Sequence, residues 1–239
     1  MTIDRRLIER LEGIRERPLD LPPLRKKMLL IRPTVTGDRF TEDSYVWAEL
    51  VREKAVTEGW EVEDLSGRDA TRNNIEDALS VIAIERPVLV FHYDHGSEFT
   101  LHGHSIDRRD LDIDDFAPAL DDHNIDVAAG TFVSAMACLS ASGLGPLAIY
   151  ERVSGYLGYA EALWGSISHP DRFGEAVNAP NYALLEGKTP EEAYEIGYQA
   201  WERVRQEELE EARTRDGLFA YASMAAAQIN RDGLTLLLP

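Results

Sequence analysis

The sequence VLVFHYDHGS, residues 88–97, joins a short apolar run to a polar tail. The run is rich in β-branched and aromatic side chains and is bounded by loop-forming residues, which predicts a buried strand. The tail carries two histidines, His92 and His95, and then a glycine and a serine. This stretch therefore predicts a core strand that brings reactive side chains to one edge of a sheet.

A second stretch of the same kind is TFVSAMACLSA, residues 131–141. Its apolar run also predicts a buried strand, and the run leads into Cys138, the only cysteine of the chain. The carboxyl ends of parallel strands lie at the edge of the sheet where open α/β folds bind ligands. If the two strands are parallel neighbours, His95 and Cys138 emerge side by side at that edge.

The rest of the chain alternates between strand and helix patterns. Strands are predicted at 27–32, 60–65, 155–159 and 234–238, and helices at 41–59, 74–84, 145–152, 173–185, 189–213 and 218–230. This alternation predicts a mostly parallel sheet with helices on both faces. We therefore expect one α/β domain over residues 27–239, built as a three-layer sandwich. Residues 1–26 are expected to form an appended helix and a proline-bearing linker.

Four local features are also expected. Thr41 is expected to cap the helix that follows it, and Pro180 to break or kink the helix that contains it. A small hairpin is expected over residues 98–106, turning at Gly103, and a short helix over residues 114–123.

Composition limits the function classes. The chain has 239 residues and a formal charge of −18, with 43 acidic against 25 basic residues. Such a surface repels phosphate backbones and anionic lipid, so we expect neither a nucleic-acid nor a membrane partner. The first residues lack a signal-peptide core, and a single cysteine fits a reducing compartment, so a cytoplasmic location is expected. Nothing in the sequence predicts the oligomeric state.

A thiol beside an imidazole suggests nucleophilic chemistry. A neighbouring base converts a cysteine to the thiolate, which is a good nucleophile near neutral pH. The backbone N–H groups of Gly96 and Cys138 are candidates for an oxyanion hole. The alternative is that Cys138 is an inert buried thiol, because free cysteine is among the most buried residue types.

Both blocks resemble the caspase-like superfamily of cysteine peptidases, which includes caspases, legumain, gingipains, clostripain and separase. The shared pattern is a hydrophobic strand with His-Gly at its end, then a second strand with Ala-Cys at its end; here these pairs are His95-Gly96 and Ala137-Cys138. The gingipain-like branch is most similar, although Asp94 stands where its block has glycine. The resemblance implies the caspase-like fold and a thiol protease without a cofactor. It also implies His95 as the base or acid and Cys138 as the nucleophile.

The neighbouring charged residues leave substrate preference open. Asp94 and Glu98 are candidates for a pocket that selects arginine or lysine through a charge-assisted contact. Arg32, at the end of the first predicted strand, is a candidate partner for an acidic substrate residue. These alternatives predict opposite substrates.

Two further functions remain as alternatives to a cysteine endopeptidase with a Cys-His dyad that acts on proteins or peptides. One is an inactive member of the same fold that serves as a binding or scaffolding module. The other is a metal-dependent hydrolase that uses His92, His95, His102 and His104, since histidine is the commonest metal ligand. We favour a site without a metal, because positions 92 and 95 of a strand point to opposite faces.

Overall fold

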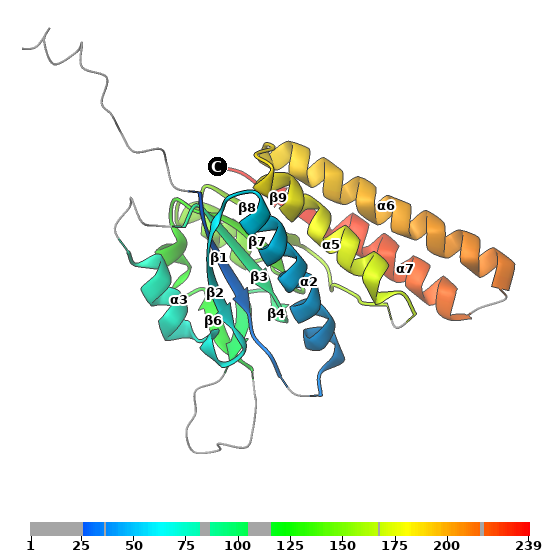
Figure 1. The fold of residues 1–239 in the computed structure, drawn as a ribbon, viewed down its shortest axis with the longest axis horizontal. Helices are drawn as coiled ribbons and strands as arrows, with labels where there is room; N and C mark the ends of the chain where they lie inside the picture. Colours follow the sequence, from blue (N-terminus) through cyan, green and yellow to red (C-terminus); the bar gives the residue numbers. More distant parts are fainter. Residues whose placement is uncertain (1–25, 36, 82–86, 105–115, 167, 216–217) are drawn as a thin grey trace, which may run out of the picture.

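The computed structural model describes residues 26–35, 37–81, 87–104, 116–166, 168–215 and 218–239. Its centre is a six-stranded sheet with the strand order β2-β1-β3-β7-β8-β9 (Figure 1). The strands are β1 (Lys27–Arg32), β2 (Glu61–Ser66), β3 (Leu89–Tyr93), β7 (Phe132–Met136), β8 (Gly155–Tyr159) and β9 (Leu234–Leu237). All neighbours pair in parallel except β8 and β9, which are antiparallel. The prediction of an α/β protein with a mostly parallel central sheet is confirmed.

Helices lie on both faces of this sheet. The first face packs against α2 (Arg39–Thr57), α5 (Pro170–Leu185), α6 (Pro190–Arg215) and α7 (Leu218–Gly233). The second face packs against α3 (Arg72–Leu79) and α4 (Leu144–Tyr150). Among the described residues these six α-helices and the sheet are compatible with a three-layer sandwich.

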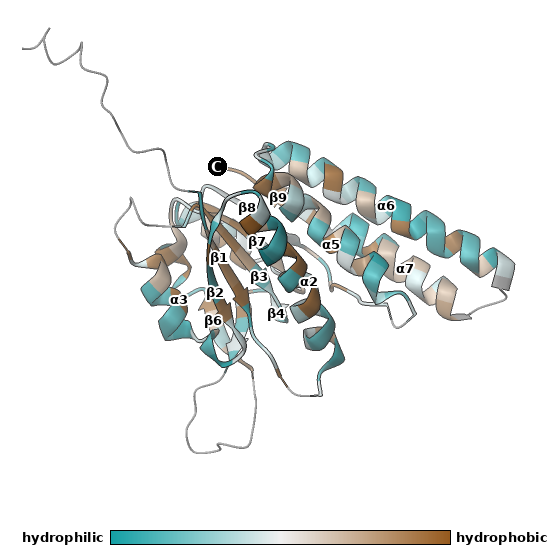
Figure 2. Ribbon diagram, viewed as in Figure 1, coloured by the Kyte–Doolittle hydropathy of each residue, from teal (hydrophilic) through white to brown (hydrophobic). Residues whose placement is uncertain are grey.

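The alternation of side chains along the strands separates two cores. In β1, Met28 and Leu30 join the core on the first face, whereas Leu29 and Ile31 join the core on the second, and all four are 0% exposed. Figure 2 shows the apolar residues concentrated on the strands and polar residues on the outer surfaces of α3 and α6. Burial on both faces explains why the strand sequences are almost continuously apolar.

A small second sheet lies on the second face and corrects two expectations. It consists of β4 (Gly96–Ser97), β5 (Thr100–His104) and β6 (Phe116–Asp121), all antiparallel. Ser97 pairs with Thr100, so the hairpin turns at Glu98 and Phe99 and not at Gly103. Gly103 instead lies within β5, where an added Cβ would stand 2.8 Å from the Ala119 Cβ.

The helix expected over residues 114–123 is wrong for its described part. Residues 116–121 form β6, which pairs with β5 and places Leu120 opposite Leu101. Both leucines are 0% exposed in the second core. Cross-strand burial, which the local sequence does not report, decides the conformation here.

Helix α2 begins earlier than expected because Asp38, and not Thr41, is its N-cap. The Asp38 carboxylate accepts a hydrogen bond of 2.9 Å from the Thr41 N–H. A capping carboxylate satisfies a free N–H of the first turn. This position brings Asp38 towards the carboxyl edge of the sheet.

Helix α5 is continuous through Pro180, which was expected to break or kink it. Pro180 lies against Gly197 of α6, where an added Cβ would be 3.1 Å from the Pro180 Cγ. The glycine therefore allows α5 and α6 to approach closely at the proline. Packing between the two helices offsets the free-energy cost of the backbone hydrogen bond that Pro180 cannot donate.

A buried polar network ties α5 to the centre of the sheet. The Tyr93 hydroxyl donates to the Asn178 side chain at 2.7 Å and accepts from the Asn181 amide at 2.6 Å. Ser134 of β7 donates to Asn181 at 2.7 Å. All four residues are at most 5% exposed. The network links two strands to one helix with every hydrogen bond shielded from water.

Two further points concern what the structure describes. Residues 1–25 of the predicted extension and linker lie outside the described part of the chain. No helix within the described residues has both the length and the apolar composition that crossing a membrane requires.

Replacing Tyr93 by phenylalanine is expected to destabilise the protein by about 1–3 kcal/mol, because two buried amide groups lose a partner. The measurement is the free energy of unfolding in urea. Tyr150→Phe is the control, since Tyr150 is 80% exposed. A Tyr93→Phe variant within about 0.5 kcal/mol of the wild type would contradict the network's contribution.

Candidate active site

The pairing of β3 with β7 brings the two sequence blocks together. The two strands are parallel, and their ladder aligns His92 with Ala135 and Tyr93 with Met136. Continuing the same offset by two residues aligns His95 with Cys138. Beyond the ladder, the Asp94 N–H donates to the Met136 carbonyl at 3.4 Å.

Gly96 confirms that the two loops touch. A Cβ at this position would lie 2.8 Å from the Ala137 Cβ and 3.5 Å from the Cys138 carbonyl oxygen. A side chain at position 96 would collide with that of Ala137, so only glycine allows the two loops to approach this closely. The two segments singled out from the sequence are therefore neighbours at one edge of the sheet.

Cys138 is half-buried and its sulfur is held by the loop after β8. The Leu163 N–H donates to the Cys138 Sγ at 3.3 Å, and the Leu163 carbonyl lies 3.6 Å from the same sulfur. The next residue, Leu139, has φ +56°, a left-handed conformation that is rare for residues other than glycine. A strained turn thus follows the thiol, as is common at functional sites.

His95 is positioned by one carboxylate and two aromatic rings. Its Nε2 lies 3.2 Å from the Asp38 Oδ1. The Phe40 ring centroid lies 5.1 Å from that of His95, and the Phe116 centroid lies 4.9 Å away on an edge. The imidazole is therefore restricted from three parts of the fold, which are the loop before α2, α2 itself and β6.

Asp38 is a site residue that the sequence did not reveal. Burial alone would raise the pKa of its carboxyl, but the Thr41 N–H and the His95 ring outweigh burial and lower that pKa below its usual value. An aspartate three residues before Thr41 at the start of a helix was a capping signal that could have located it. The sequence contained no sign that the cap would also contact His95.

Asp94 differs from its expected role. It is 0% exposed, and the Thr41 hydroxyl donates to its carboxylate at 2.8 Å. Burial raises its pKa to about 6, although hydrogen bonds from the His95 backbone and Thr41 oppose this shift. The structure therefore places Asp94 beneath the site, bound to α2, and not at a surface that a substrate side chain reaches.

Arg32 also differs from its expected role as a partner for an acidic substrate residue. It is 5% exposed and forms a two-pronged contact with Asp64 at 2.8 and 2.5 Å. Its third nitrogen lies 2.6 Å from Glu49, and its guanidinium stacks 4.5 Å from the Tyr45 ring centroid. Its charge is already matched within the protein, so it is not available to an acidic substrate residue in this structure.

Glu98 is the predicted contact residue that stays exposed. It forms the β4–β5 turn, and its carbonyl accepts from the Leu144 N–H at 2.6 Å. This bond joins the turn to the start of α4. The role of its side chain in binding a substrate stays a prediction.

The remaining histidines of the cluster do not gather into a metal site with His95 in the described part of the chain. His92 is 0% exposed and donates through Nε2 to the His102 carbonyl at 2.7 Å, and burial lowers its pKa to about 4. His102 stacks near Phe116 and His104 is buried in β5. Within the described residues, none of these histidines shares a convergent set of ligand atoms with two other candidate ligands.

The comparisons with known proteins add no assignment. No family model matches this chain, and no curated protein matches it.

Replacing Asp94 by asparagine is expected to flatten part of the pH dependence of stability. A carboxyl whose pKa is raised on folding stabilises the folded state at low pH, and this stabilisation falls as the pH rises between about 4 and 6. Relative to the wild type, Asp94→Asn should therefore gain stability across that window. Urea unfolding at a series of pH values measures the difference.

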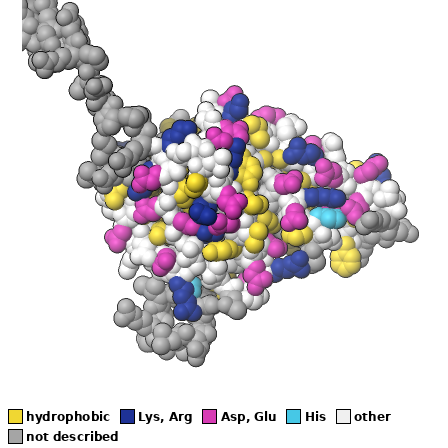
Figure 3. Space-filling model, in the orientation of Figure 1, with side chains coloured by type: hydrophobic (Ala, Val, Ile, Leu, Met, Phe, Trp, Pro, Cys, Tyr) yellow, Lys and Arg dark blue, Asp and Glu magenta, His cyan; other side chains and the backbone are white. Residues whose placement is uncertain are grey.

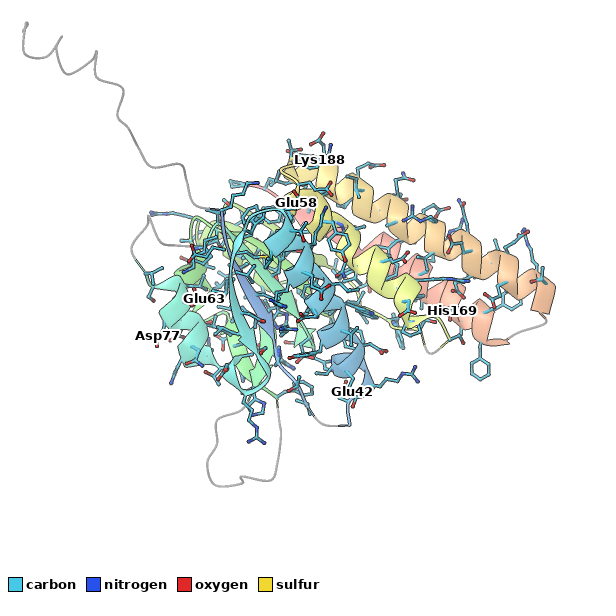
Figure 4. All side chains as sticks on the ribbon, viewed as in Figure 1. Glu42, Glu58, Glu63, Asp77, His169 and Lys188 are labelled. Carbon is cyan, nitrogen blue, oxygen red and sulfur yellow. The ribbon has the colours of Figure 1, made fainter. Side chains whose placement is uncertain are left out.

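Asp77→Asn is the matched control for removing one carboxylate, since Asp77 lies exposed on α3 (Figure 4). If the stabilities of the wild type and Asp94→Asn change in parallel from pH 4 to 7, the raised pKa of Asp94 is contradicted.

Proposed function

We propose that the protein is a cysteine peptidase that cleaves peptide bonds with Cys138 as the nucleophile and His95 as the proton carrier. The observation that carries the proposal is the approach of the two blocks, with Gly96 packed against the Ala137 side chain and the Cys138 carbonyl. The sheet order and the two helical layers are consistent with the caspase-like fold that the sequence motifs imply. A protein or peptide is the proposed substrate.

The chemistry follows from the positions of the polar groups. The Nε2–H of His95 donates a hydrogen bond to the Asp38 carboxylate, which leaves Nδ1 to accept the proton of the thiol. The thiolate attacks the peptide carbonyl, and the negative oxygen is stabilised by the N–H groups of Gly96 and Cys138. The C–N bond then breaks, and the imidazolium returns its proton to the departing amine.

A water molecule completes the cycle. His95 removes a proton from the water, whose oxygen attacks the thioester carbon. The C–S bond breaks, the carboxylic acid leaves, and the sulfur regains its proton. The Leu163 N–H, which lies 3.3 Å from the sulfur, is placed to stabilise the negative charge that forms on it when the proton moves to His95.

One observation favours a second function. The Cys138 sulfur has both an N–H and a carbonyl of Leu163 within hydrogen-bonding distance, as a thiol with a purely structural role would. An inactive binding module of the same fold is therefore the alternative.

Replacing Cys138 by alanine is expected to lower peptide hydrolysis by about 10⁴-fold or more, and His95→Ala by a comparable factor. Release of a fluorophore from a peptide library measures the activity. His123→Ala is the control, because the His123 side chain is 79% exposed and lies outside the site. Hydrolysis that survives Cys138→Ala would refute the proposal.

Alkylation separates the peptidase from the binding module. Cys138 is the only cysteine, so one iodoacetamide adduct in the mass spectrum reports it alone. A reactive thiol in the folded protein is expected, with slower labelling of His95→Ala. Labelling that occurs only in urea, together with no hydrolysis, would favour the binding module.

Asp38 provides a separate test of the positioning of His95. Asp38→Asn keeps a good N-cap but removes the charge, whereas Asp38→Ala removes both. We expect both variants to lose kcat by up to about 100-fold, and only the alanine variant to lose about 1 kcal/mol of stability. Unchanged kcat in Asp38→Asn would show that the charge of Asp38 does not orient the imidazole.

A further inference from the structure

A cavity of about 140 Å³ lies between the loop after β8 and the helix α7. Trp164 and Gly165 form its wall on the loop, and Phe219, Ala222 and Ala226 form its wall on α7. The remaining lining comes from two serines, Ser168 and Ser223, and none of the described lining residues carries a charge. The loop ends at His169, which begins α5 near the first turns of α7 (Figure 4).

The wall of the cavity begins one residue after Leu163, which contacts the thiol. Leu163 contacts the Cys138 sulfur through its backbone, and Trp164 follows directly. Asn230 of α7 fixes this point, since its side chain accepts from the Trp164 N–H at 2.9 Å and donates to the Trp164 carbonyl at 2.8 Å. The same rigid loop therefore holds the sulfur and forms the mouth of the cavity.

The rim of the cavity exposes aromatic surface to solvent. Trp164 is 54% exposed and Phe219 is 69% exposed. Large apolar side chains that remain exposed beside a concave site are typical of a binding surface. An apolar cavity of about 150 Å³ is large enough to bind benzene, so this one can accept an aromatic ring or a branched aliphatic chain.

Two of the three charged residues that the sequence had indicated for substrate recognition are not available for it. Arg32 is paired with Asp64 and Glu49, and Asp94 is buried beneath His95. On the face shown in Figure 3, acidic and basic side chains are interspersed and form no single-sign patch.

We propose that this cavity is the specificity pocket of the peptidase and receives a large apolar side chain of the substrate. The inference rests on the proposed function, because the pocket is tied to the reacting sulfur through Leu163, which contacts that sulfur, and Trp164, which lines the pocket. The residues that precede the cleaved bond remain attached to the sulfur in the thioester, so we assign the occupant to one of the two residues nearest that bond. The substrate class is therefore peptides with leucine, phenylalanine or a similar residue at one of those positions.

The experiment measures kcat/KM of the full chain on a matched set of fluorogenic peptides. The two residues before the cleaved bond are varied among phenylalanine, leucine, alanine, aspartate and arginine. We expect the phenylalanine and leucine peptides to exceed the alanine peptide by at least about tenfold, because the pocket buries several additional methylene groups. The charged peptides should be poorer than the alanine peptide.

Ala222→Leu fills the pocket from an exposed position on α7, so the variant is expected to fold. It should reduce the preference for phenylalanine over alanine by about tenfold. Ala225→Leu is the control, since Ala225 is exposed on the same helix but does not line the cavity. It should leave the preference unchanged.

The outcomes separate the two proposals. A preference for aspartate or arginine, or an apolar preference that Ala222→Leu does not change, overturns the pocket assignment and leaves the cysteine peptidase standing. Complete absence of Cys138-dependent hydrolysis overturns both the pocket assignment and the proposed peptidase function.

Discussion

The parallel pairing of β3 with β7 is the constraint on which the rest of the site depends. Two buried strands that share one register end at the same edge of the sheet, and His95 and Cys138 each follow two residues after the last aligned pair, Tyr93 and Met136. A slip of one residue would reverse the face of every side chain and would move each residue of one core into the other, where the space does not match it. The requirement to bury both faces therefore also sets the relative height of the imidazole and the thiol. The glycine at position 96 then allows the two loops to touch.

The start of α2 supplies the second half of the arrangement. Asp38 caps the helix and contacts the His95 ring, and Thr41, one turn further, binds the buried Asp94 carboxylate. One helix terminus thus orients the His95 ring and binds the acid beneath it. A change at this terminus affects helix stability and the position of the imidazole together, which is why the asparagine and alanine variants of Asp38 are informative as a pair.

Much of the fold could be predicted because the strands are continuous apolar runs, as in β1 and β3, and such runs depend little on distant residues. The hairpin could not be predicted, because Gly103 was interpreted as a turn when it is needed for close contact with Ala119. At the site, the two motifs lie on loops that the fold brings into contact, as the sequence predicted, whereas their catalytic roles stay predictions. The roles of Arg32 and Asp94 could not be predicted, because their burial depends on partners such as Asp64, 32 residues away from Arg32.

The clamp between Asn230 and Trp164 has a consequence for biosynthesis. These residues are 66 positions apart, and the loop that they fix is the one that holds the Cys138 sulfur. A nascent chain leaving the ribosome therefore presents the thiol long before the side chain that immobilises its loop has been made. The clamp can form only after α7 has been synthesised and has docked, so an incomplete chain held on the ribosome lacks the contact that fixes the loop around the sulfur.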